Sequence, residues 1–101
     1  LREMVAAGQF REDLYFRLGA HAVALALKIK AAFADNGYTV YIDSYTNQQF
    51  FRLPNEVIDS LREEVSFDYW GARGERHSIV RFVTSWSTTT EDVDRLIEIL
   101  N

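Results

Sequence analysis

The 101-residue sequence contains no cysteine, and it has one proline and two histidines. Without cysteine the chain has no disulfide, no thiolate nucleophile and no zinc-thiolate site. The histidines, His21 and His77, have no second ligand three or four residues away, so a metal site is not expected. Charged residues interrupt every apolar stretch, and we therefore expect neither a signal peptide nor a membrane span.

An excess of positive charge is also lacking. Acidic residues outnumber basic residues by 15 to 11, for a net charge of -4. A negative chain repels phosphate backbones and anionic lipids, so neither nucleic acid nor a membrane is expected as a partner. What the sequence does have is 48% hydrophobic and 14% aromatic residues, enough for one globular domain, which we expect to be cytoplasmic. The start at Leu1 rather than Met predicts a piece of something longer.

Hydrophobic periodicity predicts a long amphipathic helix that begins at Asp13 and runs for about six turns. Its apolar residues recur at steps of three and four: Leu14, Leu18, Ala22, Leu25, Ile29 and Phe33. The helix should end near Gly37, since glycine can adopt the left-handed conformation of a helix end. Gly19 lies inside the helix and should cost about 1 kcal/mol relative to alanine, which is tolerable if a neighbouring element packs closely there.

Further along the chain, alternation and turn residues predict six more elements. They are strands at 38–43 and 46–53, a helix from Pro54 to 64, strands at 65–70 and 78–86, and a helix at 88–101. Thr88 and Glu91 have the spacing of a capping box for the last helix. The order α-β-β-α-β-β-α predicts an α+β fold, a mostly antiparallel four-stranded sheet with helices on one face. Residues 1–12 are expected to be a separate segment, foreign or a helical extension, before a domain at 13–101.

The last predicted strand carries a permanent charge, Arg81, among apolar residues. Side chains alternate between the faces of a strand, so Arg81 lies opposite the presumed core face. That face is expected to hold Val80, Phe82, Thr84 and Trp86. The face of Arg81 is also apolar, which predicts that another domain covers it. Its guanidinium needs acceptors, and two readings are open: a bidentate grip on a ligand carboxylate, or a structural ion pair or edge position.

Three segments carry a resemblance to a known family: "LYFRLGAHAVALALKIKAAF", "GYTVYIDSYTNQQFFRLPNEVIDSL" and "VRFVTSWSTTTEDVDRLIEIL". Through them residues 13–101 resemble the small C-terminal domain of the L-threonine aldolase and β-eliminating lyase family, pyridoxal-phosphate enzymes of the aspartate-aminotransferase fold type. The resemblance implies that Arg81 binds the α-carboxylate of an amino-acid substrate. Thr46, Asn47 and Gln48 match a family motif to which no role is assigned.

A pyridoxal-phosphate enzyme needs a lysine for the Schiff base, an acidic partner for the pyridine nitrogen and a phosphate cradle. The only lysines, Lys28 and Lys30, lie on the long helix, are expected on its solvated side, and do not follow a strand. The resemblance therefore implies a chain without cofactor or activity of its own, completed by a large cofactor-binding domain. The alternative is a structural module whose open sheet face binds a second copy, as a homo-oligomer.

The segment "LREMVAAGQFREDLYFRL", residues 1–18, carries a second resemblance. It is similar to part of the AAA+ ATPase domain of NtrC-like enhancer-binding proteins, in which two arginines six residues apart approach the nucleotide γ-phosphate. Arg11 and Arg17 match these arginine fingers. No GxxxxGK[ST] loop exists in the chain, so complete ATP binding or hydrolysis is not expected. A chimera of two families and a fortuitous likeness both stay open.

Other candidate sites have simpler explanations. The loop "GARGER" could meet an anion, but a solvated hairpin loop is favoured. Glu63, Glu64 and Asp68 could act as acid and base, but a charged helix end is favoured. The aromatic residues are expected in the core or an interface: Phe50, Phe51, Trp70 and Trp86.

Overall fold

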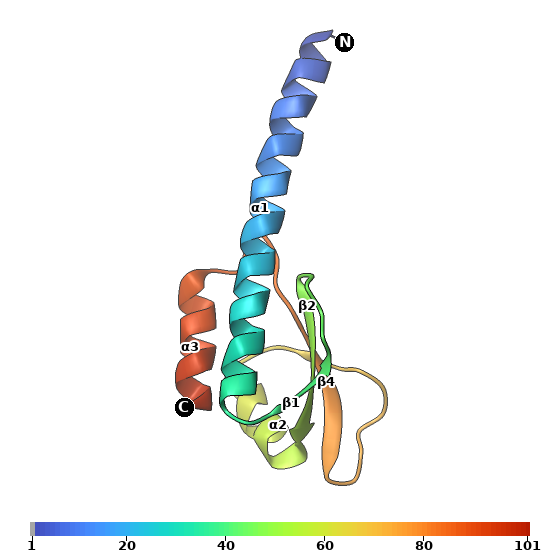
Figure 1. Cartoon of the computed structure of the whole chain (residues 1–101), viewed down its shortest axis with the longest axis vertical. Helices are drawn as coiled ribbons and strands as arrows, with labels where there is room; N and C mark the ends of the chain where they lie inside the picture. The colour runs from blue at the N-terminus through green and yellow to red at the C-terminus, as the bar shows by residue number, and fades with distance from the viewer. Residues whose placement is uncertain (1) are drawn as a thin grey trace.

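Three helices pack on one face of a four-stranded antiparallel sheet in the computed structural model of the chain (Figure 1). The structure describes the backbone of residues 2–101 and the side chains of residues 19–101. The elements are α1 (Arg2–Asp35), β1 (Thr39–Ile42), β2 (Gln48–Pro54), α2 (Asn55–Arg62), β3 (Asp68–Tyr69), β4 (His77–Val83) and α3 (Thr90–Leu100). The predicted fold class and element order are confirmed. The boundary predicted at residue 12 falls within α1 and stays a prediction.

Helix α1 buries the predicted apolar stripe against the sheet, as far as its side chains are described. Ala22, Leu25, Ile29 and Phe33 are all buried. The helix stops because Gly37 takes a φ of 84°, which allows the amide of Tyr38 to turn back to the carbonyl of Phe33.

No element packs closely on Gly19 in the part of the chain that the structure describes. A Cβ built there would meet no atom within 4 Å beyond its own helix backbone and chain neighbours. The close packing that would offset the cost of this glycine is therefore missing, and Gly19 is a weak point of α1 rather than a packing site.

The sheet has the strand order β1-β2-β4-β3, with β2 and β4 as its central pair. Their register runs over seven residues, from Gln48 opposite Val83 to Pro54 opposite His77. Pro54 was expected to begin a helix, but it is the last residue of β2, because its ψ of 140° is extended. The third strand is also shorter than expected, with two residues paired to β4.

One core joins the sheet to all three helices. Phe33 of α1 stacks on Phe51 of β2 with ring centroids 4.2 Å apart, and Phe67 stacks on Phe82 of β4 at 4.7 Å. Burying such a side chain stabilises the fold by about 1.5–3 kcal/mol. The remaining members of the cluster are Leu25, Ile29, Leu53, Ile58, Leu61, Val80, Val93 and Leu96.

Strand β4 confirms the predicted alternation as far as it extends. Val80, Phe82 and Thr84 are buried on the helix side. Trp86, expected on the same face, is instead 72% exposed. The strand ends at Val83, so the two-residue period no longer determines the direction of side chains beyond Thr84.

Helix α3 begins with a capping box, but one residue later than predicted. The amide of Asp92 donates to Thr89 Oγ1 at 3.1 Å, and the amide of Thr89 donates to Asp92 Oδ2 at 3.1 Å. Thr88, expected to be the cap, instead accepts a hydrogen bond from the amide of Ser85 at 2.9 Å. The hydroxyl of Thr88 therefore closes the preceding turn and leaves Thr89 to cap the helix.

Candidate functional site

Arg81 lies at the middle of β4 on the sheet face opposite the helices. Its Cα partners are Phe50 on β2 and Asp68 on β3. The guanidinium donates from Nη2 to Asp68 Oδ2 at 2.8 Å, and its Cζ lies 5.5 Å from the ring centroid of Trp70. The side chain is 31% exposed. Of the two readings of Arg81, the structure contains the ion pair, and its partner is Asp68.

The guanidinium of Arg81 has more donors than it uses. Arginine carries five N–H donors, and the bond to Asp68 is the one hydrogen bond that this side chain makes to the described residues. Nε is buried and has no acceptor among those residues. A buried donor without an acceptor costs about 1–3 kcal/mol, and such groups are rare enough to need an explanation. Nη1 also makes no hydrogen bond to the described residues and is not buried, so it is the donor that Arg81 has to spare for an anion.

Apolar side chains surround the charge. Phe50 is buried although it points away from the helices, because the Trp70 ring packs against it in a T-shaped arrangement with ring centroids 5.0 Å apart. Ile42 and Val83 are partly open to solvent beside it, as is Trp70 itself. The open face of the sheet, defined by these four residues and Arg81, is thus an apolar surface with one cation in it.

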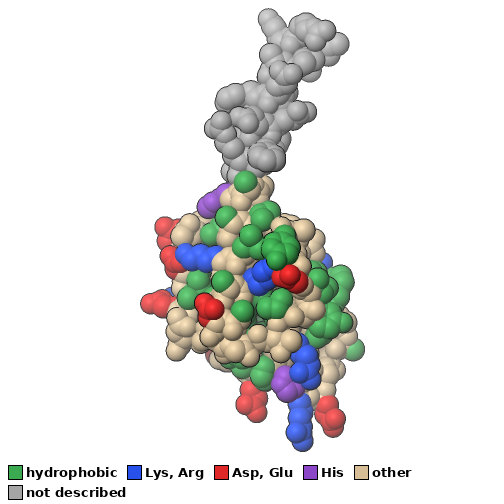
Figure 2. All heavy atoms as spheres, viewed as in Figure 1, with side chains coloured by type: hydrophobic (Ala, Val, Ile, Leu, Met, Phe, Trp, Pro, Cys, Tyr) green, Lys and Arg blue, Asp and Glu red, His purple; other side chains and the backbone are tan. Residues whose placement is uncertain are grey.

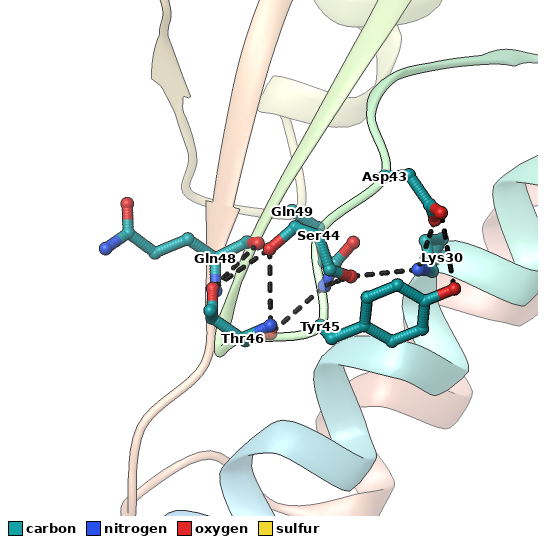
Figure 3. Close-up of polar contacts among 7 residues, drawn as sticks. All are labelled: Lys30, Asp43, Ser44, Tyr45, Thr46, Gln48 and Gln49. Atoms are coloured by element: carbon teal, nitrogen blue, oxygen red, sulfur yellow. Dashed lines mark hydrogen bonds and ion pairs between the residues drawn. The ribbon is translucent and has the colours of Figure 1, made fainter.

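The turn after β1 holds a polar cluster against α1 (Figure 3). Lys30 Nζ donates to Asp43 Oδ1 at 2.9 Å and to the carbonyl of Ser44 at 2.8 Å, and it lies 4.0 Å from the ring centroid of Tyr45. The hydrogen bond from Lys30 and its charge hold the pKa of Asp43 below its ordinary value, and a hydrogen bond from Tyr45 acts in the same direction. Lys30 was expected in solvent, but its side chain is only 15% exposed because this turn folds over it.

Within the same turn, Thr46 and Gln49 fix the start of β2. Thr46 Oγ1 accepts from the amide of Gln48 at 3.1 Å, and the buried side chain of Gln49 donates to the carbonyls of Ser44 and Thr46. The side-chain amide of Gln48 points away from the cluster (Figure 3). Thr46 therefore has a structural role, which the sequence did not assign.

Asn47 connects the turn to the end of β4. Its side chain donates to the carbonyl of Thr84 at 2.9 Å, and its own carbonyl accepts from the amide of Thr84 at 3.0 Å. Thr84 Oγ1 in turn donates to the carbonyl of Ala22 in α1 at 2.6 Å. Asn47 and Thr84 thus attach β2, β4 and α1 to one another at the end of the strand that carries Arg81.

An open apolar groove of about 970 Å³ runs beside α1, between Val23 and Leu27 on the helix and the rings of Tyr45 and Trp86 opposite. These two rings are among the most exposed large apolar side chains described, at 69% and 72%. Figure 2 shows hydrophobic side chains at the surface where α1 meets the body of the domain. Among residues 19–101, no charged side chain lines the groove, so this part of it offers packing rather than chemistry.

The loop of residues 71–77 is engaged within the fold. Arg73 makes two hydrogen bonds to Asp59, at 2.9 and 3.0 Å, and a third to the hydroxyl of Tyr69 at 2.6 Å. The hydrogen bonds from Arg73 lower the pKa of Asp59, and the same contact raises the pKa of Arg73. Arg76 does not join this contact and is exposed. Of the two arginines in this loop that could meet an anion, Arg73 thus already has a carboxylate partner.

The other candidate residues are not brought together. Glu64 pairs with Arg95 at 3.3 Å, whereas Asp68 pairs with Arg81, and Glu63 is exposed.

No group of three histidine, aspartate or glutamate side chains that could hold a metal exists among the described residues; His21 and His77 are exposed. No described helix is both long and apolar enough to cross a membrane. Arg11 and Arg17 lie outside the residues whose side chains are described.

The lysines do not fit a pyridoxal-phosphate site. Lys28 pairs with Asp94 of α3 at 2.7 Å, and Lys30 pairs with Asp43. Both belong to α1, which covers the sheet face opposite Arg81. The chain has no third lysine. A cofactor in reach of Arg81 would have to be held by residues of another domain.

The fold and the open face define a class: a small α+β domain that presents one arginine on a sheet face left uncovered by its own helices. The fold is similar to part of the solved structure of threonine aldolase from Leishmania major, which superposes with a TM-score of 0.82 at 31% sequence identity. The match covers 87% of this chain and 26% of that one, so the chain spans about a quarter of the enzyme. No protein-family model and no curated protein matches the chain significantly. The fold implied by the aldolase resemblance is confirmed, while the comparison gives no support to the AAA+ likeness.

Proposed function

We propose that this chain is the small domain of a pyridoxal-phosphate-dependent amino-acid lyase of the threonine-aldolase type, and that Arg81 holds the α-carboxylate of the amino acid. The observation that carries the proposal is the state of Arg81: a guanidinium on an open apolar face, whose accessible Nη1 makes no hydrogen bond to the described residues. The likeness to the Leishmania major aldolase supports the choice of enzyme class.

The chemistry of the side chain suits a carboxylate. A guanidinium is planar and permanently charged, and its paired N–H groups match the two oxygens of a carboxylate. Arg81 is held in place by the register of β4 with β2 and by the Trp70 ring beside it. Phe50 beside Arg81 is buried, so the surface around the guanidinium is well packed. Fewer water molecules would then compete with Arg81 for hydrogen bonds to a bound carboxylate.

The domain needs a partner for catalysis. Its lysines are engaged in ion pairs on the other side of the sheet, so the cofactor belongs to a larger domain that covers the open face and leaves a ligand between itself and Arg81. Exposed Ile42, Trp70 and Val83 supply apolar contact area for that domain. Alone, the chain binds a carboxylate and performs no reaction.

Nuclear magnetic resonance on the ¹⁵N-labelled chain tests the binding step. The probe is N-acetylglycine, an α-carboxylate with a blocked amine, and the control probe is N-acetylglycinamide, which lacks the charge. We expect saturable shifts of the Arg81 Nε–H signal and of the Trp70 and Asp68 amides with the acid only. Arg81→Lys keeps the charge but removes the paired N–H groups of the guanidinium, and it should weaken binding by about tenfold. Equal shifts with both probes, or no effect of Arg81→Lys, would contradict the proposal.

A second function, self-association, is favoured by the same exposed apolar residues. A second copy would then cover the open face instead of a cofactor domain. Sedimentation equilibrium over a wide concentration range separates the two functions. A monomer at all concentrations argues for the small domain of an enzyme. A tight dimer that the substitution Trp70→Ser dissociates argues for a self-associating structural module.

A further inference from the structure

We propose that Asp68 is an internal carboxylate that occupies Arg81 while the site is empty, and that an incoming ligand carboxylate displaces it. Asp68 would then set the affinity and the selectivity of the site. This inference rests on the proposed function of Arg81 and concerns how that residue is regulated.

The register of the sheet places the two residues together. Asp68 lies directly opposite Arg81 in the pairing of β3 with β4, and β3 is the edge strand of the sheet. Oppositely charged residues at such positions attract each other across the strands. Asp68 Oδ2 accepts from Arg81 Nη2 at 2.8 Å, so the side chain imitates one half of a bound carboxylate.

The pair is incomplete when it is compared with the other arginine–aspartate pair of the domain. Arg73 and Asp59 share two hydrogen bonds, one to each carboxylate oxygen, and Tyr69 adds a third. Arg81 and Asp68 share one, and Asp68 Oδ1 makes none to the described residues. A ligand carboxylate that offers both oxygens thus has an advantage over Asp68, whereas an anion offering a single contact does not.

Displacement requires little rearrangement. The Asp68 side chain is 63% exposed, and an exposed ion pair contributes weakly to stability. The backbone after it is fixed independently, because the amide of Trp70 donates to the carbonyl of Ile79 at 2.8 Å. Rotation of the Asp68 side chain into solvent therefore frees Nη2 without separating β3 from β4.

The test is the N-acetylglycine titration repeated on Asp68→Asn. Removing the competing charge should tighten binding about two- to fivefold, the range that an exposed ion pair can supply. Asp94→Asn is the matched control, because Asp94 is a similarly exposed aspartate that pairs with Lys28 and its loss changes the net charge equally. It should leave the dissociation constant unchanged. Thermal unfolding by circular dichroism checks both variants, and Asp68→Ser replaces Asp68→Asn if that variant does not fold.

The outcomes separate the two proposals. Binding that needs Arg81 but is unchanged or weaker in Asp68→Asn overturns the role of Asp68 and leaves the carboxylate site standing. Equal tightening in Asp68→Asn and Asp94→Asn also overturns it, since net charge alone would explain the gain. Absence of binding in the wild type and in both Asp68 variants contradicts the carboxylate site itself, and the inference with it.

Discussion

Gly74 is the residue where the 71–77 loop turns back onto β4. Its amide donates to Ser78 Oγ, and a Cβ built on it would lie 2.1 Å from the carbonyl oxygen of His77. Because backbone cannot move aside as a flexible side chain can, Gly74→Ala should lower the free energy of unfolding by about 1–3 kcal/mol. Urea denaturation measures this. The same substitution at Gly19 is the control and should stabilise the chain by about 0.5–1 kcal/mol, since it removes only a helix penalty; two effects of the same sign would contradict the geometry.

The acid side of the stability profile should depend on Asp43. The pKa of Asp43 is lowered in the folded chain, chiefly by the hydrogen bond from Lys30. Ionised Asp43 therefore stabilises the fold at pH values above the pKa that the carboxyl has in the unfolded chain. This contribution is lost as the pH falls through the lower pKa of the folded chain. Asp43→Asn should therefore reduce stability at neutral pH, and the difference from wild type should shrink as pH falls below about 4 and vanish below the lowered pKa of the folded chain. Denaturation at a series of pH values tests this. The effect should be much smaller in a Lys30→Gln background, where only the hydrogen bond from Tyr45 still lowers the pKa of Asp43; a difference that persists in acid would exclude the ion pair as its source.

At the scale of elements, the start of α3 depends on one hydroxyl. Thr89→Ala removes the side-chain half of the capping box and should cost about 1 kcal/mol. Thr90→Ala, one residue into the helix, is the matched control and should be neutral or slightly stabilising, because alanine is the better helix former. Chemical denaturation of the two variants provides the comparison. Equal losses would mean that the box is not what begins the helix.

Most of the elements could be predicted because their apolar periods are long and regular, as in α1. The errors lie where local spacing leaves two solutions. Thr88 with Glu91 and Thr89 with Asp92 both satisfy a capping box, and a contact outside the helix, the amide of Ser85, decides between them. Pro54 could end a strand or begin a helix, and the pairing of β2 with β4 extends to it.

At the scale of the whole molecule, Thr84 attaches β4 to both α1 and the turn before β2. Thr84→Val keeps the shape but removes the hydroxyl that donates to the carbonyl of Ala22, so unfolding should become easier by about 1–3 kcal/mol. Thr39→Val, at an exposed position of β1, should change stability by less than about 0.5 kcal/mol. Guanidinium denaturation with an unchanged slope would support a single cooperative unit; a Thr84→Val variant as stable as wild type would refute the link.

Arg81 could be singled out from the sequence because a permanent charge interrupts an apolar strand. Its partner could not, since several acidic residues were available and the register of a two-residue strand selects Asp68. The burial of Lys30 was missed for a similar reason: the turn that covers it is positioned by Gln49 and Asn47, through contacts between residues distant from Lys30 in the chain.

Helices α1 and α3 pack together, joined by Lys28 with Asp94 and by Asn36 with Asn101. During synthesis, α1 leaves the ribosome long before α3 has been made. Until then, Ile29 and Phe33 lack the cover that Val93 and Leu96 provide in the finished domain. The nascent domain therefore exposes a hydrophobic surface until α3 has been made, a state that favours binding by chaperones and delays the folding of the domain until its last helix is present.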